Sequence, residues 1–218
     1  MKNYLTIDDL PNLDNAVAEA LTLKKDPYKY NNIGKNKTLG MLFFNPSLRT
    51  RLSTQKAAQQ LGIHTMIMNF SNDAWALEFE DGTEMSGLRS EHIKEAAAVV
   101  SQYCDIVAIR AFASLTDKES DETEKVMHNF AKYASIPVVN MESATAHPLQ
   151  ALADAITIKE HSTIKRPKIV LTWAPHPKAL PHAVANSFTR MVQKLDAEFV
   201  IAHPDGYTLD PKITKSTP

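Results

Sequence analysis

Short apolar runs alternate along the chain with longer segments whose apolar residues recur at helical spacing. The apolar runs predict β-strands at residues 38–44, 65–70, 106–110, 137–140, 168–173 and 198–202. The helical spacing predicts helices at residues 14–25, 47–61, 91–103, 122–134, 148–161 and 180–195. Alternating strands and helices are typical of the α/β class, so we expect doubly wound parallel sheets.

Local signals set the expected ends of several helices. Asp14 and Ser90 have side chains that can cap the helices around them. Gly62 is expected to stop the helix before it. Pro148 stands in the first turn of its helix, where a missing N–H costs nothing.

The pattern divides the chain into two α/β units. We place a first domain at residues 1–147 and a second at 148–218, where the next helix begins. The second unit contains only two strands, too few for a sheet that buries both faces, so we expect this domain to be incomplete. Residues 71–89 form a polar stretch that is too long for a plain connection, and loops of that length are usually functional or disordered.

Charge and composition exclude several classes of protein. The 218 residues carry 24 Lys and Arg against 25 Asp and Glu, so nothing attracts the chain generally to nucleic acid or anionic membranes. Cys104 is the only cysteine, which favours a reducing compartment. No apolar run has the length of a signal peptide core or a membrane span, so we expect a cytoplasmic protein.

Polar and cationic side chains follow four of the predicted strands. In an open α/β sheet, ligands bind in the crevice outside the carboxyl ends of the strands, so these groups can converge there. They are the segment 45–51, Arg110, then Glu142, His147 and Gln150, and finally His176 and Lys178. This layout is typical of an enzyme site.

The segment from Ser47 to Arg51 reads Ser-Leu-Arg-Thr-Arg and lies where a strand ends and a helix begins. Free backbone N–H groups, hydroxyls and a guanidinium at a helix N-terminus bind phosphate. The segment has no glycine and is no Walker loop. Alternatively it is only a Ser-capped helix with two solvated arginines, which would be the better interpretation if the motif stood alone.

The phosphate-binding interpretation becomes the better one when the segment is considered together with Arg110, His147 and Gln150. The same set of residues occurs in one known family. The chain resembles the aspartate and ornithine carbamoyltransferases, in which Ser-x-Arg-Thr-Arg, a later arginine and His-Pro-x-Gln follow one another. Trp75, Glu142 and the segments 172–181 and 183–187 resemble the branch that acts on N-succinylornithine or N-acetylornithine. The resemblance implies a carbamoyltransferase of arginine biosynthesis, with no nucleic-acid or membrane partner.

The resemblance also implies roles for residues of the first unit. The phosphate of carbamoyl phosphate would be bound by Ser47, the Leu48 backbone N–H, Arg49, Thr50 and Arg110. Thr50, Arg110 and His147 would be catalytic, because they would donate to the carbamoyl oxygen, where negative charge develops. Gln150 would accept from the carbamoyl amide. No cofactor and no metal is implied, since the departing phosphate can take the proton of the attacking amine.

Four residues are expected to contact the acylated ornithine. The resemblance places Glu142 at its α-amide end, His176 and Lys178 near its carboxylates, and Ser90 at the acyl chain. Proline at that last position accompanies succinyl specificity in the branch and glutamate accompanies acetyl specificity. Serine cannot repel a succinyl carboxylate, so the sequence favours succinylornithine. Lys178 favours it too, although a solvated loop cation is an equal interpretation.

Trp75 implies a homotrimer, since in this branch the tryptophan reaches into the carbamoyl-phosphate site of the adjacent subunit. The alternative is a tryptophan packed against its own loop. Family members also run on for roughly another hundred residues, as domain size requires. A second hypothesis therefore stays open, in which the chain is a truncated, non-catalytic paralogue that only binds carbamoyl phosphate or another phosphate-bearing ligand.

Overall fold

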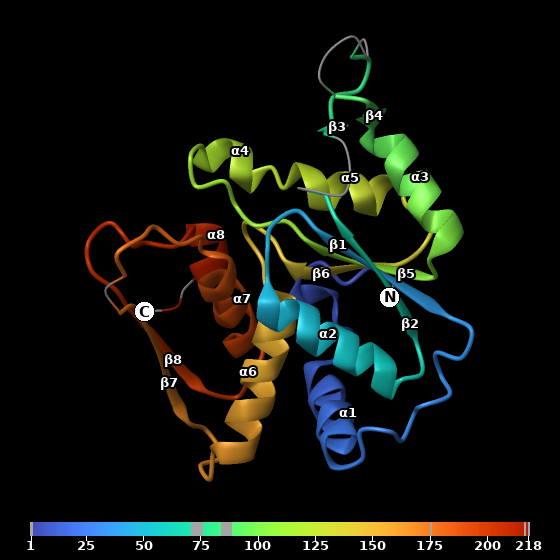
Figure 1. Ribbon diagram of the computed structural model, residues 1–218. Coiled ribbons are helices and arrows are strands. Elements are labelled where there is room, and N and C mark those ends of the chain that lie inside the picture. The colour runs from blue at the N-terminus through green and yellow to red at the C-terminus, as the bar shows by residue number, and fades with distance from the viewer. Residues whose placement is uncertain (1, 71–75, 84–88, 175, 216, 218) are drawn as a thin grey trace.

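The computed structural model describes residues 2–70, 76–83, 89–174, 176–215 and 217 (Figure 1). The strands are β1 Thr38–Phe43, β2 His64–Asn69, β3 Leu77–Glu78, β4 Glu91–His92, β5 Ile106–Arg110, β6 Val138–Glu142, β7 Lys168–Thr172 and β8 Glu198–Ala202. The helices are the 3-10 turn η1 Ile7–Asp9, α1 Leu13–Lys25, α2 Leu48–Gln60, α3 Ile93–Tyr103, α4 Lys118–Glu122, α5 Lys125–Tyr133, α6 Pro148–His161, α7 Ala183–Val192 and α8 Pro211–Thr214.

A four-stranded parallel sheet with the order β2-β1-β5-β6 organises the first unit. Strand β2 lies on one side of β1, and β5 and then β6 lie on the other side. The strand order therefore reverses between β1 and β5, whose last residues Phe43 and Arg110 are register partners. A crevice opens at such a switch point, and ligands of α/β proteins bind there.

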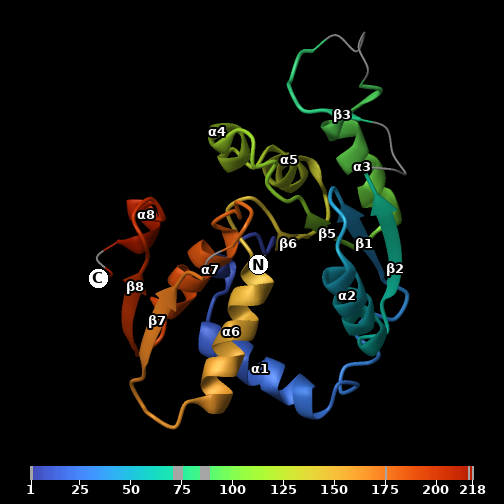
Figure 2. The same cartoon turned by 60° about the vertical axis from the view of Figure 1, so that its left-hand side comes forward.

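Apolar side chains cover both faces of this sheet. Leu42 of β1 joins a buried cluster with Phe130 of α5, on the face that α3 and α5 cover. Its neighbours Met41 and Phe43 join the cluster on the opposite face, which includes Ala58 of α2. Figure 2 shows α2 on one side of the sheet and α3 and α5 on the other. The predicted doubly wound parallel architecture is confirmed.

The second unit is smaller and packs against the first through helices. Strands β7 and β8 pair in parallel as a separate two-stranded sheet. A third apolar cluster joins α1, α6 and α7, with Val17, Ala151, Ala155 and Met191 among its buried members. Helix α6 therefore packs against both units (Figure 2), and the domain boundary at residue 148 stays a prediction.

Two predicted helix caps are wrong. Asn12 caps α1 in place of Asp14, because its Oδ1 accepts a backbone N–H of the first turn at 2.8 Å. Ser90 does not cap α3, since the chain continues in the extended conformation through β4 before the helix starts. His92 is the cap there, with Nδ1 accepting a backbone N–H at 3.2 Å.

Two predicted segments differ in the structure. The helix expected at residues 122–134 begins only at Lys125, as α5, because Glu124 has a φ of 49°, which cannot belong to a right-handed helix, and the separate short helix α4 precedes it. The long polar stretch 71–89 contains β3, which pairs with β4 in parallel. Trp75 lies outside the described residues.

Two element ends differ in the neighbourhood of the predicted site. Strand β6 extends to Glu142, because the ladder with β5 continues past an irregularity between Ile109 and Arg110. Helix α7 begins at Ala183 rather than at residue 180, since Pro181 disfavours the helical conformation for the residue before it. None of the helices in the described ranges is long and apolar enough to cross a membrane.

Candidate functional site

The N-terminus of α2 offers unused donors. Ser47 is the N-cap in an extended conformation, yet its side chain makes no capping hydrogen bond. Its hydroxyl and the N–H groups of the first turn therefore remain available to a ligand. Arg49 is exposed and makes no hydrogen bond or ion pair within the described residues. Arg51 differs, because it bonds Asn69 and lies over the Phe43 ring at 4.9 Å.

Arg110 is held in place by an ion pair with Glu142. Its Nη2 and Nε lie 2.8 and 3.0 Å from the same carboxylate oxygen, Oε2. The two side chains are only 12% and 13% exposed. Nη1 also donates to the Pro46 carbonyl at 3.2 Å, which ties the strand end to the segment before α2. The guanidinium is thus fixed at the switch point, while Glu142 Oε1 makes no hydrogen bond in the described part of the chain.

His147 is the N-cap of α6, and its surroundings determine which tautomer it adopts. Its Nδ1 accepts the backbone N–H of Gln150 at 3.4 Å, so the proton of the neutral ring sits on Nε2. Burial lowers its pKa below the ordinary value of 6.5. Glu142 and Asp154 oppose this shift, and Arg110 adds to it. The imidazole is therefore neutral at pH 7 and can donate from Nε2.

Gln150 is oriented by a residue that the sequence interpretation missed. Its Nε2 donates to Asp154 Oδ1 at 2.8 Å, which leaves the amide oxygen as the group that can accept from a ligand. Burial raises the pKa of Asp154, and the bond from Gln150 and the nearby His147 oppose the rise. The spacing of four residues on one helix was the available signal.

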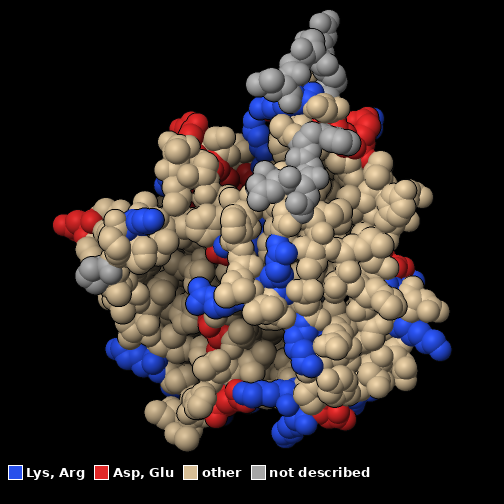
Figure 3. Space-filling view, in the orientation of Figure 1, with Lys and Arg blue, Asp and Glu red and all other residues tan. Residues whose placement is uncertain are grey.

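One cavity collects most of the predicted carbamoyl-phosphate residues. It has a volume of about 740 Å³. Its lining includes Ser47, Arg49, Thr50, Arg110, Glu142, His147 and Gln150. Figure 3 shows Lys and Arg side chains gathered down the middle of the face that carries α2 and α6. Leu48 is absent from this lining and 73% exposed, so the predicted contact of its backbone N–H stays a prediction.

His176 and Lys178 lie in a second cavity, also of about 740 Å³. The two cavities adjoin, because Phe112, Glu142 and Val184 line both. The Nδ1 of His176 lies 2.8 Å from the carbonyl oxygen and 3.1 Å from the backbone nitrogen of Lys178, which closes a local turn.

Ser90 is not brought to either cavity. Its backbone N–H donates to the Ala76 carbonyl at 3.3 Å, beside the small sheet of β3 and β4. Neither cavity lining includes it. Trp75 lies outside the described residues, so these two predicted contacts stay predictions.

Comparison with known proteins agrees with this geometry. Residues 2–160 match the family model described as the aspartate/ornithine carbamoyltransferase, carbamoyl-P binding domain. This chain belongs to the aspartate/ornithine carbamoyltransferase family. It is 50% identical over 212 residues to the N-succinylornithine carbamoyltransferase of Bacteroides fragilis (strain 638R), covering 97% of the chain and 67% of the relative.

Members of the N-acetylornithine group are also similar. The N-acetylornithine carbamoyltransferase of Xanthomonas axonopodis pv. citri (strain 306) is 39% identical over 218 residues, covering 96% of the chain and 62% of the relative. A crystal structure of a glutamate-to-serine mutant of N-acetyl-L-ornithine transcarbamylase, complexed with carbamyl phosphate and N-succinyl-L-norvaline, superposes with a TM-score of 0.90 at 37% identity. The match covers 99% of this chain and 66% of that one. The chain thus spans about two thirds of the length of these relatives.

We predict that His147 titrates below pH 6.5 and that Asp154→Asn lowers its pKa further. Burial disfavours the imidazolium in the folded protein, and the substitution removes a negative charge that stabilises it. Nitrogen NMR of the histidine side chains measures this, with the His147 signals assigned by their loss in His147→Gln. A His147 pKa at or above 6.5 contradicts the prediction, and the exposed His64 should not respond to Asp154→Asn.

The same pKa has a consequence for stability. Because the folded-state pKa of His147 lies below its unfolded value, the unfolded chain binds the proton more tightly. The contribution of His147 to the free energy of unfolding is therefore lost as pH falls through 6.5 towards the folded pKa. Replacing His147 by Gln should flatten the pH dependence of urea unfolding in this window.

Proposed function

We propose that this chain binds carbamoyl phosphate and takes part in transferring the carbamoyl group to the δ-amine of an N-acylornithine, in arginine biosynthesis. The products are N-acylcitrulline and phosphate. The observation that carries this proposal is a single cavity that joins the N-terminus of α2 to Arg110, His147 and Gln150. Two relatives named N-succinylornithine carbamoyltransferase, with 50% and 49% sequence identity, support it. A cytoplasmic location, free of membrane and nucleic acid, is part of the proposal.

The phosphate would lie at the start of α2. There the N–H groups of the first turn, the Ser47 hydroxyl and the Arg49 guanidinium offer several donors and a positive charge. Because Arg49 has no carboxylate partner within the described residues, its planar guanidinium can bind the phosphate bidentately without losing an ion pair to any of them. Thr50 lines the same cavity and adds a hydroxyl.

The carbamoyl group would point towards His147. Attack by the amine places negative charge on the carbonyl oxygen, and preorganised donors at that oxygen supply a large part of catalysis. The Nε2 proton of neutral His147, the Thr50 hydroxyl and Arg110 are such donors. The amide oxygen of Gln150 would accept from the carbamoyl NH₂ group. The C–N bond then forms, the C–O bond to phosphate breaks, and the leaving phosphate takes the amine proton.

The acceptor would occupy the adjoining cavity. Glu142 lines both cavities, so it stands where the two substrates must meet. Its oxygen Oε1 makes no hydrogen bond with the described residues and can accept from an N–H group of the acceptor. His176 and Lys178 line the far part, where a cation suits the carboxylates of an acylated ornithine.

We propose succinyl rather than acetyl as the acyl group. A second carboxylate would have a cation available in Lys178, which makes no ion pair within the described residues. Ser90 stands, by the resemblance, where acetyl-specific members carry glutamate. The mutant transcarbamylase in which serine replaces a glutamate was solved with N-succinyl-L-norvaline, which supports this choice.

A homotrimer is the second part of the proposal. Ser90 lies outside both cavity linings of its own chain, so a neighbouring copy is the natural source of a contact with the acyl group. Leu48 and Leu52 stand one helical turn apart on α2 and are 73% and 58% exposed, as expected of a surface that another copy covers.

The alternative remains a protein that only binds carbamoyl phosphate. The described residues supply most groups of the carbamoyl-phosphate side but only part of the acceptor side. A third of the relatives' length has no counterpart in these 218 residues. Binding and transfer are therefore separate measurements below.

We expect Arg49→Lys to weaken carbamoyl-phosphate binding by more than about tenfold, because an ammonium cannot match two phosphate oxygens in one plane. Titration calorimetry on the 218-residue chain measures the dissociation constant. Arg166→Lys is the matched control, since Arg166 is an exposed arginine of the α6–β7 connection and lines neither cavity. Equal affinities in wild type and Arg49→Lys would remove Arg49 from the site.

Transfer should favour N-succinylornithine over N-acetylornithine and leave plain ornithine untouched. The assay is N-acylcitrulline formation by a form extended to the length of the relatives, with the 218-residue chain measured beside it. We expect the shorter form to bind carbamoyl phosphate and transfer it very slowly, because two reactants must be held together and positioning supplies about 7 to 11 kcal/mol of barrier reduction. Carbamoyl-phosphate binding without transfer by the extended form would favour the binding-only alternative.

The acyl preference has its own variant pair in the same assay. Ser90→Glu should lower the preference for the succinyl substrate by roughly tenfold through charge repulsion. Ser90→Gln has the same size without the charge and should not. If both variants act alike, size rather than charge governs the effect.

We expect light scattering on the purified chain to give about three subunit masses. Trp75→Ala should then lower carbamoyl-phosphate affinity without unfolding the protein, since the resemblance places this side chain in the neighbouring site. A monomer that binds carbamoyl phosphate with the same affinity as the assembled protein would refute the trimer.

A further inference from the structure

The turn that precedes His147 is closed by a hydrogen bond between its own first and last residues. It comprises residues 143–146, between β6 and α6. The Ser143 N–H donates to the Ala146 carbonyl at 2.8 Å. Beneath it, the fully buried Asn140 donates to the Ser143 hydroxyl at 2.9 Å and to the Leu5 carbonyl at 2.9 Å. The backbone immediately before the imidazole therefore has one defined shape.

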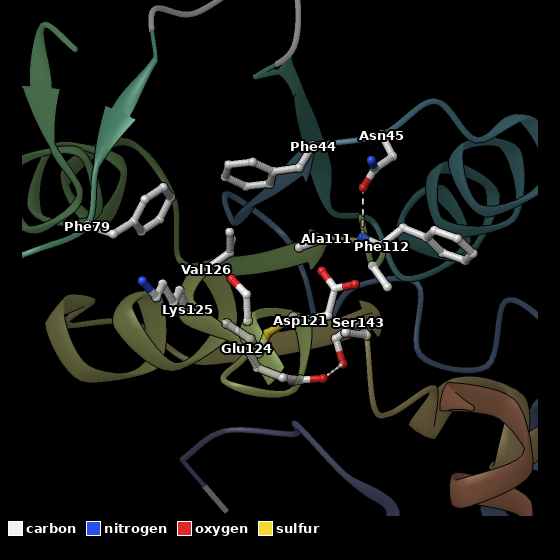
Figure 4. A pocket seen from close by; sticks show the side chains of 14 residues that line it. Phe44, Asn45, Phe79, Ala111, Phe112, Asp121, Glu124, Lys125, Val126 and Ser143 are labelled. Atoms are coloured by element: carbon white, nitrogen blue, oxygen red, sulfur yellow. Dashed lines mark hydrogen bonds between the residues drawn. The ribbon is translucent and has the colours of Figure 1, made fainter. Parts of the chain in front are cut away.

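Glu124 contacts this turn from another element. Its oxygen Oε1 accepts the Ser143 hydroxyl at 2.7 Å, the Thr145 N–H at 2.6 Å and the Thr145 hydroxyl at 2.6 Å. Figure 4 shows the Glu124 side chain reaching to Ser143. Three donors converge on one carboxylate oxygen, and such charge-assisted bonds are shorter and stronger than neutral ones.

The backbone of Glu124 adopts a conformation that its residue type disfavours, although the side chain keeps this contact with the turn. Its φ and ψ are 49° and 42°, a left-handed conformation that is unfavourable for a residue with a Cβ atom. It is also the N-cap of α5, yet its side chain makes no capping bond there. The carboxylate leaves its own helix uncapped and bonds the turn, and strained backbone of this kind clusters at functional sites.

Helix α7 contacts the same turn from the second unit. Asn186 Nδ2 donates to the Thr145 carbonyl at 3.2 Å, and the His147 N–H donates to Ser187 Oγ at 2.8 Å. Thr145 is thus held between Glu124 on one side and α7 on the other. Removing the Glu124 carboxylate would leave the turn attached to α7 while releasing it from the first unit.

We propose that Glu124 is a positioning residue for His147. Its carboxylate fixes residues 143–145 and thereby the direction in which the imidazole presents Nε2 to the cavity beside α2. Glu124 is absent from the lining of that cavity and instead lines a smaller one of about 240 Å³, with Phe44 and Phe79 (Figure 4). It therefore does not line the cavity in which a ligand would meet His147, and its contact with the turn is the link between them. Its importance for catalysis rests on the proposed function, whereas its effect on the imidazole does not.

The test uses Glu124→Gln in the 218-residue chain. Glu119→Gln is the matched control, because it replaces the same carboxylate by the same amide at an exposed position of α4. We expect the nitrogen NMR signals of His147 to move in Glu124→Gln and to stay in place in Glu119→Gln. Unchanged His147 signals in a folded Glu124→Gln protein would overturn the proposal.

Carbamoyl-phosphate binding provides a second readout. Glu124→Gln should weaken it roughly fivefold, and this loss should vanish when His147 is already replaced by Ala, because Glu124 acts through the imidazole. A loss of the same size in both backgrounds would assign Glu124 a purely structural role. If the wild-type chain does not bind carbamoyl phosphate, the proposed function fails and the NMR result alone decides on Glu124.

A milder variant covers the case in which Glu124→Gln does not fold. Thr145→Val keeps the shape of the side chain and removes only the hydroxyl that donates to Glu124. It should move the His147 signals in the same direction by a smaller amount. Identical His147 signals in Thr145→Val and wild type would then count against the proposal.

Discussion

The ion pair between Arg110 and Glu142 is the interaction on which the arrangement of the site depends. It joins the ends of β5 and β6, and through the Pro46 carbonyl it also holds the segment that follows β1. Both groups are nearly buried, so removal of either would leave an unpaired charge, at a cost of about 3–5 kcal/mol. The pair therefore sets the relative position of three chain segments at the switch point of the sheet.

The same pair places opposite charges where the two cavities adjoin. Arg110 lines the cavity beside α2, and Glu142 lines both cavities. Arg49 lines the same cavity but is exposed, and it has no ion pair within the described residues. The site therefore combines positive and negative charge rather than charge of one sign.

Much of the fold, and the convergence of the predicted site residues on one cavity, could be predicted from the sequence because the signals are local. The run from Ser47 to Thr50 is contiguous, and the α/β alternation places Arg110 and His147 at the same sheet edge without any knowledge of long-range contacts. Helix ends were less predictable. The prediction that Ser90 caps a helix was wrong because β3 pairs with β4, a contact that the residues next to Ser90 do not indicate.

Long-range contacts account for what the sequence did not show. The acceptor contact predicted for Glu142 stays a prediction, and what the sequence did not show is its bond to Arg110, which depends on the irregular register between β5 and β6. Glu124 looked like an ordinary helix residue, because only the folded chain brings it to Thr145.

These missed contacts share one physical property. Each joins a residue that touches the cavity, or the turn that leads to it, with a residue that is remote in sequence, and each uses a charged group with low exposure or several donors. Such bonds contribute more than neutral surface contacts and also impose direction, which apolar packing does not. The sheet core therefore determines where the elements lie, and this small set of charged hydrogen bonds fixes Arg110 at the cavity and the turn that precedes His147.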